Sequence, residues 1–156
     1  MPAALPELRL ISPHPSVTRS FGERLGAAAC AGDVIALSGP LGAGKTELAR
    51  GVARGLGVVD PVSSPTFVLI AEHEGRLPLF HLDCYRLAGP RDALGAGLLD
   101  ERRADGVTVV EWAERLGTAL PAGRLEIRLD GSGDDPRSLS CRATDARHAR
   151  LLEAAT

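Results

Sequence analysis

One short stretch constrains the fold of this 156-residue chain more than any other. Residues 39–46 read Gly-Pro-Leu-Gly-Ala-Gly-Lys-Thr and match the pattern G-x-x-x-x-G-K-[ST] in full. The continuous apolar run 34–38 (VIALS) comes directly before it, as a central strand would. A helical apolar pattern over 45–56 follows, and Gly57 lies just past its end. The sequence therefore predicts a strand, a phosphate-binding loop and a helix, which together form a P-loop.

The loop also contains Lys45, the one lysine of the chain. Wherever else the chain has lysine or arginine, the residue is arginine. Arginine is planar and bulkier, so it cannot replace the compact ammonium of lysine in a narrow phosphate cradle. We expect Lys45 to reach the β- and γ-phosphates of a nucleotide, and Thr46 to place its hydroxyl on Mg²⁺. Backbone N–H groups of the loop would hold the phosphates as well. These groups belong to Leu41, Gly42, Ala43 and Gly44.

Two carboxylates end apolar runs that have the length of buried strands. Glu111 follows residues 107–110, and Asp83 follows residues 79–82. A P-loop enzyme needs an acid at the end of a neighbouring strand, either to hold Mg²⁺ or to orient the nucleophile. We therefore predict catalytic roles for both carboxylates and a metal-binding role for Glu111. Which of the two positions the attacking water stays open.

Three other side chains have two interpretations each. Trp112, the only indole, either packs near the nucleotide or belongs to the core. Thr66 closes the proline-containing loop 58–66 and either senses a γ-phosphate or caps a turn. His81 lies in a predicted hairpin, where a core or hydrogen-bonding role is favoured over catalysis.

The remaining patterns predict an α/β fold of the P-loop NTPase type, with residues 1–156 in a single domain. Helices are expected on the flanks of a mixed sheet that contains two β-hairpins. In residues 16–30, Val17, Phe21, Leu25 and Ala28 share one helical face. The other expected elements are strands at 7–11 and 107–112, hairpins at 66–87 (turn 74–76) and 124–144, short helical patches within 90–105, and a helix over 145–155.

Composition excludes several classes of protein. The net charge of −2 argues against tight unaided binding to nucleic acid. Three widely spaced cysteines without a CxxC pair predict reduced thiols and no zinc site. No leader pattern or apolar run long enough to span a membrane is present, so a cytoplasmic location is expected. The chain lacks Asn and Gln, which a Ras-type GTPase uses to read guanine and to orient water. A small-molecule kinase stays possible, because residues 86–103 could form an arginine-bearing lid.

Four motifs in order resemble the TsaE family, also called YjeE. They are GPLGAGKTELARG, SSPTFVL, FHLDCYRL and VVEWAERL. The resemblance extends from about Thr18 to the hairpin near residue 130. The chain departs from the family pattern at Glu47, where Thr or Ser is usual, and at residues 91–95, where an acidic run is usual.

The resemblance implies a bacterial ATPase that is needed for the N6-threonylcarbamoyladenosine modification at position 37 of tRNA. Such proteins bind the TsaD–TsaB complex and reset it through ATP binding and hydrolysis, so tRNA is met indirectly. The family motifs match at Lys45 and Thr46, at the switch-like Thr66, at Asp83, and at the pair Glu111 and Trp112.

These observations lead to one hypothesis for the site. ATP and Mg²⁺ bind at the loop, with the metal on Thr46 and Glu111. Asp83 positions water or a metal-bound group, and Thr66 senses the γ-phosphate. No arginine finger is evident, so hydrolysis by the chain alone should be slow. The adenine is expected between the segment before Thr18 and the distal hairpin near Arg137.

Overall fold

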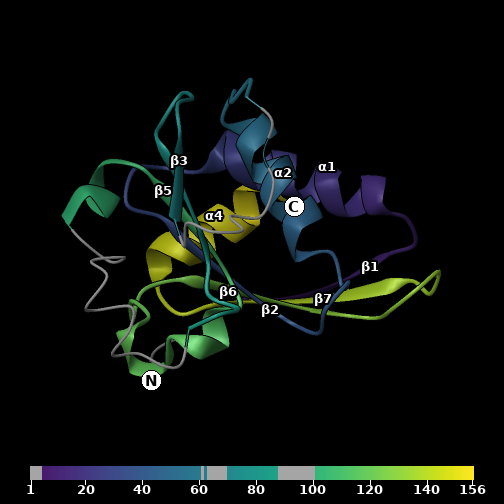
Figure 1. Cartoon of the computed structure of the whole chain (residues 1–156). Coiled ribbons are helices and arrows are strands. Elements are labelled where there is room, and N and C mark those ends of the chain that lie inside the picture. Colours follow the sequence, from purple (N-terminus) through teal and green to yellow (C-terminus); the bar gives the residue numbers. More distant parts are fainter. Residues whose placement is uncertain (1–4, 61, 63–69, 88–100) are drawn as a thin grey trace.

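The computed structural model describes residues 5–60, 62, 70–87 and 101–156 (Figure 1). Their strands form one seven-stranded sheet in the order β1-β7-β6-β2-β5-β4-β3. The strands are β1 (Glu7–Ser12), β2 (Val34–Ser38), β3 (Ile70–His73), β4 (Leu79–Asp83), β5 (Val107–Glu111), β6 (Leu125–Asp130) and β7 (Arg137–Ala143). Thr66 and most of the predicted 86–103 lid lie outside the described residues.

The sheet is mixed, as the sequence predicts. Strand β2 pairs in parallel with both β5 and β6, and β4 pairs in parallel with β5. The pairs β3–β4 and β6–β7 are antiparallel, which confirms the two hairpins, and β1 adds to β7 in the antiparallel sense. The apolar run 34–38 thus lies at the centre of the sheet, where four of its five residues are buried. Its end delivers the glycine loop to the middle of one sheet edge.

Among the described residues, three α-helices cover one face of the sheet: α1 (Pro15–Ala28), α2 (Lys45–Gly55) and α4 (Ala146–Ala154) (Figure 1). Capping residues explain where α1 and α4 begin. Pro15 follows the N-cap His14 of α1, whose side chain accepts a hydrogen bond from the backbone N–H of Ser16. Asp145 caps α4 through the backbone N–H of His148. Leu25, Leu48 and Leu151, one from each helix, meet in the main core under this face.

Helices α1 and α2 contact each other through glycine rather than through interlocking side chains. A Cβ atom on Gly22 would lie 2.9 Å from Cα of Gly51, and one on Gly26 would lie 3.0 Å from Cα of Gly55. The buried stripe of α1 therefore includes glycine, together with Thr18, Phe21 and Leu25. The predicted face is wrong at Val17, which is 42% exposed. The apolar period alone did not identify this stripe, because its closest contacts belong to residues without side chains.

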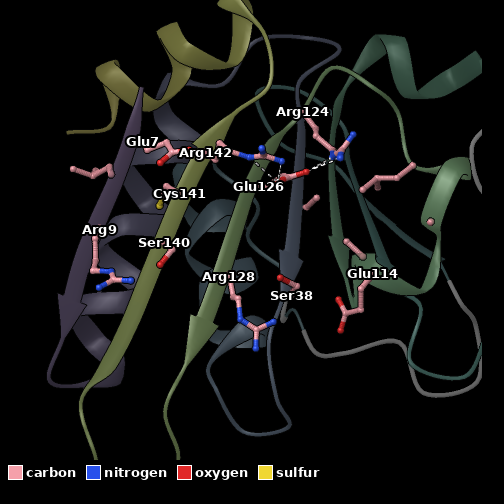
Figure 2. Close-up of a pocket in the computed structure, with 15 residues that line it drawn as sticks. Glu7, Arg9, Ser38, Glu114, Arg124, Glu126, Arg128, Ser140, Cys141 and Arg142 are labelled. Carbon is pink, nitrogen blue, oxygen red and sulfur yellow. Dashed lines mark hydrogen bonds and ion pairs between the residues drawn. The ribbon is translucent and has the colours of Figure 1, made fainter. Parts of the chain in front are cut away.

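The opposite face of the sheet is divided in two. Over β4 and β5, a smaller core forms from Leu82 and Val110 with Leu116 of the segment that contains the 3₁₀ turns η2 (Ala113–Arg115) and η3 (Gly117–Ala119). Over β1, β7 and β6, the strands present polar side chains to a cavity of about 770 Å³ (Figure 2). The remaining short element is the 3₁₀ turn η1 (Glu101–Asp105). No helix in the described part of the chain is long and apolar enough to cross a membrane.

Candidate functional site

The glycine loop takes the shape that its sequence predicts. Gly39, Gly42 and Gly44 have φ values of 134°, 80° and 108°, which residues with a side chain rarely adopt. The loop therefore curls back on itself and leads directly into α2 at Lys45. Leu41 projects from the loop and is 77% exposed, whereas Ala43 is buried against the core.

Lys45 is folded into the loop and is only 5% exposed. Its Nζ donates hydrogen bonds to the carbonyl oxygens of Gly39, at 2.6 Å, and Pro40, at 2.8 Å. It also lies 4.0 Å from the ring centroid of Trp112. Burial lowers the pKa of Lys45, and the nearby carboxylates of Glu114, Glu111 and Asp83 oppose this effect without cancelling it. The ammonium is held where phosphate oxygens would meet it.

Thr46 and Glu111 come together although 65 positions separate them in the chain. The hydroxyl Oγ1 of Thr46 donates to Oε1 of Glu111 at 2.8 Å. Glu111 is 2% exposed at the end of β5, beside β2, which carries the loop. A hydroxyl next to a carboxylate is the pair of oxygen ligands that Mg²⁺ takes in P-loop sites. The two residues predicted to hold the metal therefore fit that ion.

Asp83 lies next to Glu111, because the two residues are register partners in the parallel pair β4–β5. Its Oδ1 accepts a hydrogen bond from the backbone N–H of Tyr85 at 3.0 Å, which fixes the turn after β4. Asp83 and Glu111 both line a cavity of about 420 Å³ beside the loop. Its other lining residues are Leu41, Gly42, Gly44, Lys45, Thr46, Glu47, Tyr85 and Trp112.

Trp112 has φ 58° and ψ 42°, and among the described residues it is the one non-glycine residue with positive φ. This left-handed conformation is uncommon for a bulky residue and is found most often where function or packing demands it. It turns the chain after β5 so that the ring contacts both Lys45 and Tyr85, whose ring centroid is 4.9 Å away. Trp112 also packs against the smaller core. It therefore belongs to the core and to the loop cavity together.

Thr18 and Arg137, the two residues predicted near the adenine, line a second cavity of about 410 Å³, which shares Gly42, Gly44 and Glu47 with the cavity of about 420 Å³. Thr18 is buried, with its Oγ1 2.7 Å from Oγ of Ser12. Arg137 donates from Nη2 to the carbonyl of Gly42 at 3.1 Å. The structure therefore brings these residues to the loop, from α1 and from the β6–β7 hairpin.

For His81 the sequence favoured a core or hydrogen-bonding role over catalysis, and the structure agrees. It is fully buried in β4, and its Nε2 lies 2.5 Å from Oε2 of Glu111. The only available signal was its alternation with Asp83 in the strand, which places both side chains on one face of the sheet. Within the described ranges, no group of three or more His, Cys, Asp or Glu residues could hold a metal.

Comparisons with known proteins find relatives that match most of the chain. Residues 12–139 match the protein-family model described as Threonylcarbamoyl adenosine biosynthesis protein TsaE. The tRNA threonylcarbamoyladenosine biosynthesis protein TsaE of Bacillus subtilis is 40% identical over 149 residues, which cover 94% of this chain and 92% of that protein. The protein of the same name from Mycobacterium tuberculosis is 45% identical over 127 residues, 76% of each chain.

A solved structure is similar over nearly the whole fold. The crystal structure of YdiB from Bacillus subtilis superposes with a TM-score of 0.83 at 36% sequence identity. The match covers 99% of this chain and 97% of that one.

Proposed function

The chain belongs to the TsaE family, and from this premise we propose that it is the ATP-binding and ATP-hydrolysing component of tRNA threonylcarbamoyladenosine biosynthesis. The observation that carries the proposal is the contact between Thr46 and Glu111. It joins the P-loop to the acid at the end of the neighbouring strand, directly beside Lys45.

In the cavity of about 420 Å³ beside the glycine loop, here called the loop cavity, different residues bind different parts of ATP and its metal ion. Backbone N–H groups of residues 41–44 and the ammonium of Lys45 hold the β- and γ-phosphates. Thr46 and Glu111 would hold Mg²⁺, which supplies positive charge to the phosphates when it is bound. When ATP binds, the ammonium of Lys45 exchanges its hydrogen bonds to the carbonyls of Gly39 and Pro40 for hydrogen bonds to the phosphates.

Hydrolysis needs a water molecule in line with the γ-phosphate and stabilisation of the charge that develops in the transition state. Asp83 lies beside Glu111 at the cavity, where a carboxylate can orient that water. Lys45 stabilises the developing charge. We propose that Thr66, which follows α2 in the sequence, senses the γ-phosphate. Because no arginine lines the loop cavity in the described part of the chain, we expect slow hydrolysis by the chain alone and faster turnover when a partner completes the site.

We propose that this partner is the TsaD–TsaB complex, through which the ATPase would meet tRNA indirectly in the cytoplasm. Support comes from family membership and from the exposed position of Leu41 and Tyr85 at the cavity, which are 77% and 47% exposed. Apolar side chains that are this exposed at the mouth of a nucleotide site are suited to contact with a protein.

Substitution of Lys45 tests the proposal. In Lys45→Ala, release of phosphate from ATP and Mg²⁺ should fall about 10²–10³-fold, because a donor to the transition state is lost. Lys45→Arg should fall to a similar extent, because the planar guanidinium does not fit the cradle. Arg54→Ala changes an exposed cation on the same helix and should keep normal turnover. Normal turnover in Lys45→Ala would refute the assigned site.

A second measurement separates the proposed ATPase from a small-molecule kinase. Purified TsaD–TsaB should stimulate phosphate release by the wild-type chain and leave Lys45→Ala inactive. Consumption of ATP that requires a small hydroxyl or acid compound, and ignores TsaD–TsaB, would support the kinase instead.

A further inference from the structure

Two histidines of this protein are buried almost completely, and they differ in how their ring nitrogens are used. His148 is 2% exposed, and both of its nitrogens have partners. Its Nδ1 lies 2.7 Å from Oδ1 of Asp145, and its Nε2 accepts a hydrogen bond from the backbone N–H of Val34 at 3.0 Å. This arrangement satisfies the imidazole fully and joins α4 to β2, so His148 has a structural role.

His81 is 0% exposed and has a different environment. Its Nε2 contacts Oε2 of Glu111 at 2.5 Å, while its Nδ1 has no hydrogen-bond partner among the described residues. A buried polar atom without a partner lowers the stability of the folded protein. Apolar residues fill the neighbouring positions of β4, such as Leu79 and Leu82. An apolar side chain at position 81 would avoid the cost of the unpaired Nδ1, so the strand itself does not require histidine there.

The contact with Glu111 explains why histidine is present. One carboxylate oxygen of Glu111 accepts from Thr46 and the other accepts from Nε2–H of His81. A donor at each oxygen fixes the rotation of the carboxylate, so Oε1 faces the P-loop. Without the second donor, the side chain could turn about its last bond, and this bond has broad rotational preferences.

We propose that His81 is a positioning residue of the nucleotide site, which holds the carboxylate of Glu111 in the orientation that accepts Mg²⁺ beside Thr46. The proposal rests on the proposed function. His81 touches neither ATP nor the ion, and it acts through Glu111. Partners that orient metal ligands in this way typically contribute 10–100-fold to metal affinity or activity.

The test compares two substitutions at position 81 by calorimetric titration of ADP with and without Mg²⁺. His81→Phe keeps a ring of similar size and removes the donor. It should weaken the binding of ADP in Mg²⁺ at least 10-fold and leave metal-free ADP binding within about twofold of wild type. His81→Gln retains an N–H group near the position of Nε2 and should recover most of the lost affinity.

Stability distinguishes this role from a merely structural one. His81→Phe removes the unpaired Nδ1 but also takes the His81 donor from Oε2 of Glu111, so two opposing effects act on stability and the urea concentration at half-unfolding should stay near that of wild type. The matched control is His148→Phe, which should lose stability but keep the normal effect of Mg²⁺ on ADP binding. If His81→Phe fails to fold, His81→Leu, which also lacks the donor, and Glu111→Gln, measured singly and together, replace it. Coupling between the two in Mg²⁺ affinity is then expected.

Two results would overturn the inference. One is wild-type binding of ADP in Mg²⁺ by His81→Phe. The other is equal loss of affinity with and without Mg²⁺, together with loss of stability. A wild-type chain that binds no nucleotide would instead refute the proposed function, so the two failures are distinguishable.

Discussion

Charged side chains are buried on one face of the sheet and exposed to solvent on the other. On the face covered by α1, α2 and α4, Lys45, His81 and Glu111 are 5%, 0% and 2% exposed. On the open face, β1, β7 and β6 align charged and hydroxyl side chains in rows across the strands (Figure 2). One row pairs Glu7, Arg142 and Glu126, and the next pairs Arg9, Ser140 and Arg128.

The charged side chains of the two faces differ in how well water can hydrate them. Open-face charges neutralise one another and remain hydrated, as when Arg142 and Arg124 both bind Glu126. Burial alone would raise the pKa of Glu126, but the hydrogen bonds from these two arginines outweigh it and hold the pKa below its usual value. Charged groups on the covered face are shielded from water. For Lys45, burial is therefore the largest effect on the pKa, and it lowers that pKa. Phosphate would therefore gain more from a cation on the covered face than from one on the open face.

Thiol labelling should show the largest contrast between interior and surface. Burial raises the pKa of Cys141, in the covered core, and of Cys84, in the smaller core, to about 12 each, whereas Cys30 is exposed. Because the thiolate is the reactive form, Cys30 should react with a disulfide reagent at pH 8 at least about 10³-fold faster than the other two. Raising the pH to 9 should not change this order, since both buried thiols stay protonated far below pH 12.

Absorbance of the released thiolate should report one reactive thiol in the native protein and three in denaturant. Labelling of Cys141 at the rate of Cys30 would show that the covered face opens readily to solvent.

Gly26→Ala should have the next largest effect. Alanine normally favours a helix by about 1 kcal/mol over glycine. Here its Cβ would press on the backbone carbonyl of Val52 and lie 3.0 Å from Cα of Gly55. We expect a net loss of about 2–3 kcal/mol in the free energy of unfolding, measured by urea denaturation.

Ser20→Ala, at an exposed position of the same helix, is the control and should change stability by less than about 0.5 kcal/mol. A stabilised Gly26→Ala protein would contradict the close contact between α1 and α2.

Arg142→Ala should have the smallest effect, because it removes an ion pair from the open face. The pair with Glu126 measures 2.8 Å, but the side chain of Arg142 is 56% exposed. We expect a loss of at most about 1 kcal/mol at low salt and less in 1 M salt. Since the partner lowers the pKa of Glu126, the contribution should be present above the unfolded pKa of a glutamate, about 4.3, and fade as the pH falls below it.

A double-mutant cycle of Arg142→Ala and Glu126→Ala isolates this pair. A coupling above 2 kcal/mol would mean that the open face is less hydrated than its exposure indicates.

Much of the site could be predicted because its signals are local or follow a rule of sheets. The pattern at 39–46 specifies the loop, Lys45 and Thr46 without reference to the rest of the chain. Parallel strands end at the same edge, so Asp83 and Glu111, each at the end of an apolar run, were expected near it and are register partners. The hairpins followed from alternation and turn residues, and both are present in the sheet.

Other features could not be predicted, because they depend on pairs of residues that no local pattern links. The contact of His81 with Glu111 joins positions 30 apart and exists only because β4 pairs with β5. The glycines of α1 and α2 pack against each other, and a search for periodic apolar side chains does not detect residues that have no side chain. The left-handed conformation of Trp112 follows from the way the chain leaves β5.

By itself, then, the sequence determined the phosphate-binding loop, the class of fold and the candidate acids, because periodicity, glycine and a single lysine act over a few residues. Only the tertiary structure decided which donors orient Glu111, which face of α1 is buried and where the indole of Trp112 lies. These outcomes depend on distances between elements, and such distances arise when the strands pair and the helices pack.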